Sequence, residues 1–382
     1  MIYMDNSATT MPRREVAQTV ARAMEETWFN PSSAYAPALN SEKALERARH
    51  TILSRIGGAS AGTVVFTGGG TEGDNLAVIG ACNALRRRMH HLVTTAVEHP
   101  AVRNAAAYLA DSGWDCTVLQ TDSFGRVFPD QVAEEVREDT ALVSVMHVNN
   151  ETGCVNDVAA IAEAVKKANP ATLVHVDAVQ AFLRIPIDLS STKIDLYSAS
   201  GHKIHGPKGT GFLFVRKGVR LEGVQVGGGQ EMGLRSGTQN VPDIIGLECA
   251  VRLWDEAETA RIREIRDALQ ARITEEIPDI RINSPSDGTA APHILNIGFA
   301  GVRAETLLHA LEQKQIYVST GSACSSKHRR VSEVLDAAGV PEPYLSGSIR
   351  FSFGAFNTQE EISPTVDALK EQVTLLRRFR AR

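Results

Sequence analysis

The feature that most constrains the fold is a regular alternation of short apolar runs and longer amphipathic segments between about residues 40 and 255. Runs such as "ALVSVMHV" and "TLVHV" are rich in apolar residues, as are strands buried on both faces of a parallel sheet. Strands that alternate with helices of ten or more residues predict an α/β domain with a mostly parallel sheet. We expect strands at 64–67, 91–97, 116–120, 141–148, 172–176, 195–198 and 211–215, and helices at 41–56, 71–88, 100–112 and 158–167.

The pattern changes near residue 256, where a long, charged amphipathic helix is expected over about 247–276. It is followed by short strand-like runs, "HILNIGF" and "SIRFSF", and by further helical segments. The 382 residues also exceed what one hydrophobic core usually serves. We therefore expect a large domain of residues 15–255, with helices flanking the sheet, and a smaller α+β domain of residues 1–14 and 256–382.

Composition excludes several classes of protein. A formal net charge of −5 argues against bulk binding of nucleic acid, which needs a dense basic surface. No apolar run reaches the length of a membrane span and no signal-like segment opens the chain, so we expect a cytoplasmic location. The cysteines lack C-x-x-C spacing, so we expect free thiols and no metal site. They are Cys82, Cys116, Cys154, Cys249 and Cys324.

A glycine-rich stretch, "TGGGTEGDN" at 67–75, follows the first of these expected strands. Its glycines have the G-x-G-x-x-G spacing of a dinucleotide fingerprint, but that motif belongs in the first strand–helix turn of its fold, and some 60 residues precede it here. Backbone N–H groups at a helix start bind any anion, and Thr71 adds a hydroxyl suited to a compact phosphate. A tight turn without a ligand remains the alternative.

Asp177 and Lys203 narrow the identity of such a phosphate ligand. Asp177 ends a buried strand, and the C-terminal ends of parallel strands are where these sheets bind ligands. Lys203 lies in a glycine-bounded turn with Ser200 and His202. A phosphate site, an acid and a lysine together suit pyridoxal phosphate, which needs a Schiff-base lysine and an acid at its pyridinium nitrogen. The nearby "GPKGT" lacks the spacing of a nucleotide-binding P-loop.

Eight motifs in order along the whole chain resemble the cysteine desulfurases of the NifS/IscS class. This resemblance implies a fold-type I pyridoxal-phosphate enzyme of aminotransferase class V that works as a homodimer. It also implies that L-cysteine is converted to L-alanine while the sulfur remains on the enzyme as a persulfide. The motifs are "FTGGGTEGDN", "VEHPAV", "HVNNETG", "VDAVQ", "SASGHKIHGPKGTGFLFV", "RSGTQN", "STGSACSS" and "SIRFSFG".

The resemblance implies roles for the residues around the cofactor ring. Lys203 matches the Schiff-base lysine, which then moves protons, and Asp177 matches the acid at the pyridine nitrogen. Gln180 matches the side chain at the phenolic oxygen. His99 matches the histidine stacked on the ring, where an imidazole can also handle protons. Asn150 matches a polar residue beside both cofactor and substrate.

Other matched residues concern the phosphate and the substrate. Thr238 matches a threonine that reaches the phosphate from the partner subunit. Arg350 matches the arginine that binds the substrate carboxylate, a task for which a planar guanidinium is suited; Asn296 is expected to support that region. The phosphate holders within one subunit are Gly70, Thr71, Ser200 and His202.

Cys324 matches the cysteine that accepts the sulfur. It lies among small residues in "STGSACSSKHRR", and the basic run that follows either lowers the pKa of its thiol or is a solvated loop. Two departures from the family pattern are "KHRRVSEVL" after this cysteine, and Tyr35 and Ala38 where a histidine and a glycine are expected.

Two further functions remain open from the sequence. One is a related pyridoxal-phosphate lyase or transaminase, such as a selenocysteine lyase, and the other is a non-catalytic protein that keeps the fold to bind partners. The sulfur acceptor is either an iron–sulfur scaffold protein or a tRNA-thiolating enzyme. The loop after Cys324 resembles that of desulfurases paired with tRNA-thiolating enzymes, which favours the second acceptor.

Overall fold

The computed structural model describes residues 1–321 and 331–380. Its central element is a seven-stranded sheet with the strand order β2-β8-β7-β6-β5-β3-β4. Only β8 runs against its neighbours, so the prediction of a mostly parallel sheet is confirmed. The strands are β2 (Gly62–Thr67), β3 (His91–Thr95), β4 (Asp115–Leu119), β5 (Thr140–Met146), β6 (Leu173–Asp177), β7 (Leu196–Ser200) and β8 (Gly211–Arg216).

Helices cover both faces of this sheet. Successive residues of β2 belong to different hydrophobic clusters: the cluster of Val64 includes residues of α2, α6 and α7, whereas the cluster of Val65 includes residues of α3 and α4. This alternation is what a two-sided sheet requires, because neighbouring side chains in a strand point to opposite faces. The helices of this part are α1 (Arg14–Glu26), α2 (Ala36–Arg55), α3 (Gly70–Leu85), α4 (Pro100–Asp111), α5 (Pro129–Glu134), α6 (Val158–Ala168) and α7 (Val241–Arg252).

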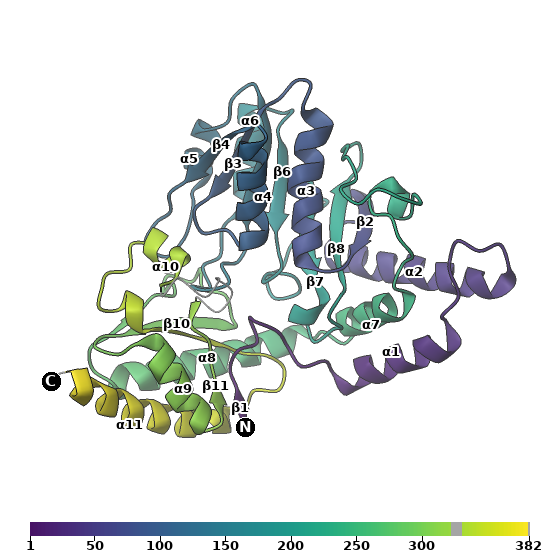
Figure 1. The fold of residues 1–382 in the computed structure, drawn as a ribbon. Coiled ribbons are helices and arrows are strands. Elements are labelled where there is room, and N and C mark those ends of the chain that lie inside the picture. The colour runs from purple at the N-terminus through teal and green to yellow at the C-terminus, as the bar shows by residue number, and fades with distance from the viewer. Residues whose placement is uncertain (322–330, 381–382) are drawn as a thin grey trace.

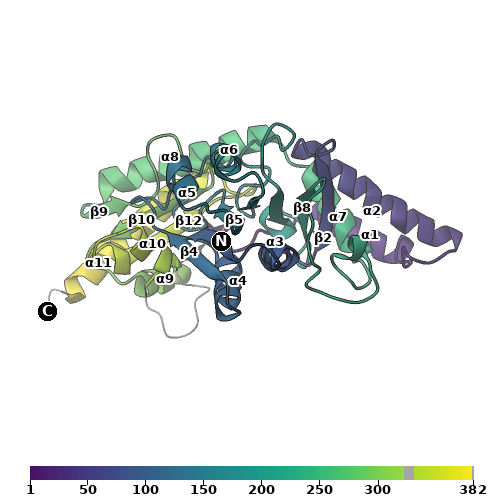
Figure 2. The ribbon, with the colours of Figure 1, turned by 90° about the horizontal axis from the view of Figure 1, so that it is seen from above.

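A second hydrophobic cluster forms the core of the C-terminal part together with Met4. In Figure 1 this part lies at the lower left, below the large sheet, while α1 and α2 project to the right, and Figure 2 shows the same separation from above. An antiparallel sheet of order β12-β10-β9 and a parallel pair, β1 with β11, belong to it. Its elements are β1 (Ile2–Tyr3), α8 (Glu256–Glu276), β9 (Ile280–Ile282), β10 (Ile294–Phe299), α9 (Ala304–Gln313), β11 (Ile316–Tyr317), α10 (Glu333–Ala337), β12 (Ser348–Ser352) and α11 (Ile362–Arg380).

The direction of the strands gathers five connections at one edge of the large sheet. The strands β3, β5, β6 and β7 are parallel, and β2 has the same direction because two antiparallel steps through β8 separate it from β7. The segments that follow these strands carry Thr71, His99, Asn150, Asp177 and Lys203. The predicted functional residues are therefore brought to the same edge by topology.

Several expected elements differ from the observed ones. The single helix predicted over 247–276 is wrong: α7 ends at Arg252, and α8 begins after Asp255, whose side chain accepts a hydrogen bond from the Ala257 N–H at 3.0 Å. The predicted domain boundary after residue 255 falls at this break and stays a prediction. The sequence reading also missed α1 and α5, although Val16, Val20 and Ala23 give α1 the i, i+4, i+7 spacing of an amphipathic helix.

Candidate active site

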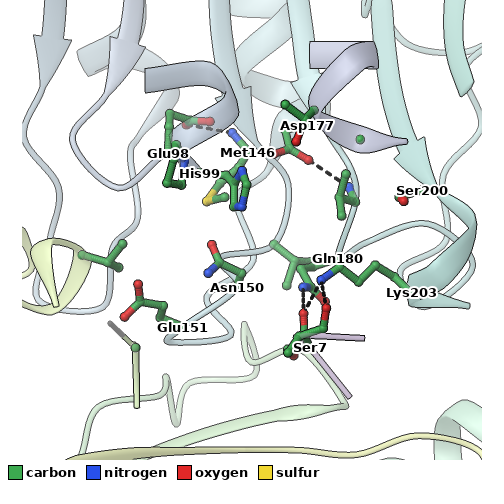
Figure 3. Close-up of a pocket in the computed structure, with 18 of the residues that line it drawn as sticks. Ser7, Glu98, His99, Met146, Asn150, Glu151, Asp177, Gln180, Ser200 and Lys203 are labelled. Carbon is green, nitrogen blue, oxygen red and sulfur yellow. Dashed lines mark hydrogen bonds between the residues drawn. The ribbon is translucent and has the colours of Figure 1, made fainter. Parts of the chain in front are cut away.

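A cavity of about 320 Å³ lies at this edge of the sheet (Figure 3). Its walls come from the N-terminal segment through Ser7, from the strand-end turns of the large sheet, and from the C-terminal part through Ser319 and Arg350. Ten of the predicted site residues line it. Those that do are Gly70, Thr71, His99, Asn150, Asp177, Gln180, Ser200, His202, Lys203 and Arg350.

Asp177 supplies a carboxylate at the end of β6. Its Oδ1 accepts a hydrogen bond from the Val179 N–H at 2.9 Å, which orients the carboxylate toward the cavity (Figure 3). Burial raises the pKa of Asp177 to about 6, while this hydrogen bond and the charge of Lys203 oppose the rise. A cationic ring nitrogen is the partner that such a buried acid needs.

Two further buried acids lie close to Asp177, and sequence reasoning assigned them no role. The carboxyl of Glu98 accepts hydrogen bonds from the Thr95 hydroxyl at 2.8 Å and from the Met146 N–H at 2.9 Å. Burial and the charge of Asp177 raise the pKa of Glu98 to about 8. Burial also raises the pKa of Asp74 well above its usual range. Asp177 therefore ionises more readily than Glu98.

Lys203 follows β7 in a single 3-10 turn, Gly201–Lys203. Its Nζ donates hydrogen bonds to the backbone carbonyls of Ser7 and, at 2.8 Å, Ala8. The Gln180 amide donates to the same Ser7 carbonyl at 2.9 Å (Figure 3). The backbone carbonyls of the N-terminal segment thus hold the Lys203 amine. Because every residue has a backbone carbonyl, the sequence did not predict these contacts.

His99 caps the N-terminus of α4. Its Nδ1 accepts a hydrogen bond from the Ala101 N–H at 3.1 Å, so the proton of the neutral imidazole is on Nε2. Burial, with the charges of Lys203 and Arg103, lowers the pKa of His99 to about 4. At neutral pH the cavity therefore contains a neutral imidazole with one N–H to donate.

An anion site lies at the start of α3. The first N–H groups of a helix have no partner within the helix, and here they border the cavity through Gly70 and Thr71. A Cβ at Gly70 would lie 2.6 Å from the Val179 side chain, so a glycine is required there. Among the described residues, the buried hydroxyl of Ser200 has no hydrogen-bond partner. An unpaired hydroxyl beside a helix start fits the phosphate of pyridoxal phosphate.

Arg350 projects from β12 at the other end of the cavity. One of its N–H groups donates to the Asn150 carbonyl at 2.9 Å and another forms an ion pair with Asp5 at 2.8 Å. Its buried Nε has no partner among the described residues. Asn296 holds the neighbouring backbone by donating to the Glu151 carbonyl at 3.1 Å. The guanidinium is thus held in place, and its Nε–H is among the donors left for a carboxylate.

Glu151 borders the same end of the cavity and was also missed from the sequence. It is buried, it accepts a hydrogen bond from the Ser332 hydroxyl, and burial raises its pKa to about 7. Nearby, Arg103 of α4 forms an ion pair with Glu333 of α10, which joins the large sheet's helices to the C-terminal part. Glu98 lies in the motif "VEHPAV" and Glu151 lies in "HVNNETG". Both acids therefore belong to segments that the family resemblance had already singled out.

Among the described residues, one predicted residue stands apart from the cavity. Thr238 is exposed on the segment between β8 and α7 and does not line it. Cys324 and the basic run Lys327–Arg330 lie outside the described residues. The four described cysteines are buried or half-buried and unpaired, and burial raises the pKa of Cys116 to about 11 and that of Cys154 to about 12. Across residues 1–321 and 331–380, no cluster of side chains is suited to a metal ion.

The fold and the cavity together define a pyridoxal-phosphate-dependent enzyme of fold type I. Residues 2–364 match the aminotransferase class-V family. A cysteine desulfurase IscS of Methanosarcina thermophila is 39% identical over 379 residues, which cover 98% of this chain and 93% of the relative. The chain therefore belongs to the aminotransferase class-V family and, within it, to the cysteine desulfurases.

Solved structures agree with this assignment. A NifS-like protein superimposes with a TM-score of 0.91 at 34% identity, covering 98% of this chain and 99% of that chain. SspA in complex with cysteine superimposes with a TM-score of 0.82 at 31% identity, covering 94% and 100%. None of the described helices combines the length and apolar character needed to cross a membrane.

The raised pKa of Glu98 predicts how pH affects stability. Its pKa rises from 4.5 to about 8 on folding, so the folded protein holds a proton that the unfolded chain has lost. The free energy of unfolding of the wild type should therefore fall relative to that of Glu98→Gln as pH rises, by at most about 1.4 kcal/mol per pH unit. Denaturant unfolding of both proteins between about pH 5 and about pH 8 measures this difference.

Glu25→Gln is the matched control, because water surrounds the exposed Glu25 side chain in the folded and unfolded states alike. The difference in free energy of unfolding between Glu25→Gln and the wild type should stay nearly constant as pH rises. Parallel stability curves for the wild type and Glu98→Gln would show that Glu98 is ionised in the folded protein.

Proposed function

We propose that this protein takes sulfur from L-cysteine, releases L-alanine and retains the sulfur as a persulfide on Cys324. The observation that carries the proposal is the cavity itself: Asp177, Lys203 and the start of α3 meet at one edge of the sheet, with Arg350 opposite. The likeness to SspA, solved in complex with cysteine, supports L-cysteine as the substrate. A non-catalytic binding protein would have no need of this arrangement.

Bound pyridoxal phosphate supplies an electron-accepting ring that stabilises negative charge at the substrate Cα. The Asp177 carboxylate would pair with the ring nitrogen and keep it protonated. Gln180 would donate to the phenolic oxygen, and His99 would lie against the ring. The start of α3, Thr71, Ser200 and His202 would hold the phosphate.

Arg350 would bind the substrate carboxylate through its unpaired Nε and a neighbouring N–H. Asp5 and the Asn150 carbonyl limit the rotation of the guanidinium, so the substrate meets a preorganised donor. Preorganisation of this kind reduces the entropy lost on binding. Burial of the Arg350 guanidinium also strengthens its attraction for a carboxylate that enters the cavity.

Lys203 and His99 are the proton carriers of the proposed reaction. The Lys203 amine would attach the cofactor and, once released by substrate, remove the Cα proton through Nζ. His99 is neutral above about pH 4. It can therefore transfer its Nε2 proton to a substrate atom and take up a proton again later in the reaction. Asn150, whose buried side-chain oxygen has no partner among the described residues, would accept a hydrogen bond from the substrate.

The Cys324 thiolate would attack the sulfur of the bound L-cysteine. A sulfur–sulfur bond forms, the bond between the substrate sulfur and its Cβ breaks, and the electron pair stays with the carbon, which takes up a proton. One L-cysteine and one enzyme thiol thus become one L-alanine and one enzyme persulfide, so atoms and electrons balance. A transaminase or a lyase that does not use an enzyme thiol has no role for Cys324.

Replacement of the acceptor thiol tests this chemistry. Cys324→Ala should abolish alanine release from L-cysteine, because the substrate sulfur has no nucleophile to receive it, while the visible absorbance of bound pyridoxal phosphate remains. Cys116→Ala is the control, since Cys116 lies on the outer strand β4, away from the cavity. Alanine release by Cys324→Ala at the wild-type rate would refute the persulfide step.

A homodimer is proposed from two features of the surface. Apolar side chains are exposed on the projecting α1–α2 region, with Trp28 62% exposed, and on the segment before α7, with Val226 88% exposed. Such a concentration of exposed apolar side chains is typical of an interaction surface. Thr238 does not line the cavity of its own subunit, which fits a threonine that completes the phosphate site of the partner subunit.

Mixed dimers test the proposed role of Thr238. Thr238→Ala should weaken pyridoxal-phosphate binding about tenfold through loss of one hydrogen bond to a charged group, whereas Thr274→Ala on α8 should not. A mixed dimer of Thr238→Ala and Lys203→Ala subunits has one site with both residues intact and should recover wild-type affinity there, measured by visible absorbance. A monomer in sedimentation, or no recovery, would contradict the proposal.

We propose a tRNA-thiolating enzyme as the sulfur acceptor and the cytoplasm as the location. The basic run after Cys324 favours an acidic acceptor surface, and the free cysteines suit a reducing compartment.

The choice of acceptor is tested with L-cysteine labelled with ³⁵S. Label should pass from the enzyme to a tRNA-thiolating enzyme faster than to an iron–sulfur scaffold protein, because the loop after Cys324 resembles that of desulfurases paired with tRNA-thiolating enzymes. Replacing Lys327 and Arg329 with glutamate should slow that transfer without changing alanine release. Preferential labelling of the scaffold protein would overturn the choice.

A further inference from the structure

The contact with the Ser7 carbonyl fixes the orientation of the Gln180 side-chain amide. Gln180 is 4% exposed in the turn after β6, and its amide lies 2.9 Å from the Ser7 carbonyl oxygen. A backbone carbonyl can only accept a hydrogen bond. The amide group that faces Ser7 is therefore the NH2 group, and this leaves its second N–H for another acceptor.

The opposite side of the Gln180 amide meets His293. The side-chain oxygen of Gln180 lies 3.2 Å from Nε2 of His293, a fully buried histidine directly before β10. Because that oxygen only accepts, Nε2 of His293 must carry the imidazole proton. Its other ring nitrogen, Nδ1, has no partner among the described residues, which agrees with an unprotonated atom.

Burial keeps His293 in this neutral form. The pKa of His293 lies well below its usual range because of burial and because the positive charges of Arg184, Arg350, Lys203 and Arg266 repel a second proton. The imidazole therefore donates one hydrogen bond throughout the neutral pH range. The Phe353 N–H donates a hydrogen bond to the His293 carbonyl at 2.9 Å. This contact connects His293 to the end of β12, the strand that carries Arg350.

The geometry points to His293 as a positioning residue for the cofactor: its Nε2–H holds the Gln180 amide so that the free N–H of Gln180 faces the phenolic oxygen of pyridoxal phosphate. The inference rests on the place proposed above for Gln180. It gives a residue of the C-terminal part, outside the cavity, control over a group that contacts the cofactor.

A hydrogen bond donated to the phenolic oxygen stabilises its negative charge, which lowers the pH at which the visible absorbance of the bound cofactor titrates. Gln180→Ala should therefore raise this midpoint. His293→Asn should raise it in the same direction, by about half a pH unit to one pH unit, the size expected for one hydrogen bond. A histidine that merely fills the core would affect stability and leave the midpoint unchanged.

The test uses the holoenzyme and a matched pair of amide variants. His293→Gln and His293→Asn have the same functional group, but only glutamine places its NH2 as many bonds from Cβ as imidazole Nε2. His293→Gln should retain the wild-type midpoint, and His293→Asn should shift it. The double variant His293→Asn with Gln180→Ala should match Gln180→Ala alone, because the two residues act in series.

Equal midpoints for His293→Gln and His293→Asn would overturn the inference, as would additive shifts in the double variant. If Gln180→Ala leaves the midpoint of the wild type unchanged, the place proposed for Gln180 is wrong and the inference falls with it. The separate effect of Gln180→Ala therefore distinguishes a failure of the proposed function from a failure of His293 alone.

Discussion

The common direction of the strands is the constraint on which the rest of the structure depends. Six of the seven strands, β2 to β7, end at one edge of the large sheet, and one antiparallel strand, β8, keeps β2 in line with the others. The start of β8 is packed tightly: a Cβ at Gly211 would lie 2.6 Å from the Ala199 carbonyl and 2.9 Å from Gly69. The anion site at α3 and the lysine after β7 are neighbours because these backbones touch.

The electrostatics of the cavity follow from burial at this edge. Asp74, Glu98 and Asp177 are close enough to disfavour one another's ionisation, and Lys203 is the cation that most directly opposes this. Burial also keeps His99 neutral. An ionised Asp177 beside a neutral Glu98 and a neutral His99 is an environment suited to a protonated ring nitrogen, because the negative charge is concentrated at one carboxylate.

The sequence predicted the parts of the site that depend on residue type. Asp177 and Lys203 were found because a carboxylate and an amine at strand ends have few chemical substitutes, and Arg350 was assigned through the resemblance to the family. The contacts of the Ser7 carbonyl were not predictable, since every residue has a carbonyl. The break between α7 and α8 was also missed, because apolar spacing continues across it and only the Asp255 cap interrupts the helix.

By itself, the sequence determined the α/β class, the mostly parallel sheet, the family and the chemistry of the cofactor site, because periodicity and motif chemistry are local properties of the chain. Only the tertiary structure decided which groups meet. The pairing of Asp5 with Arg350 and the contact of Gln180 with His293 join residues 345 and 113 positions apart. Such contacts depend on how the sheets pack, and no spacing along the chain specifies them.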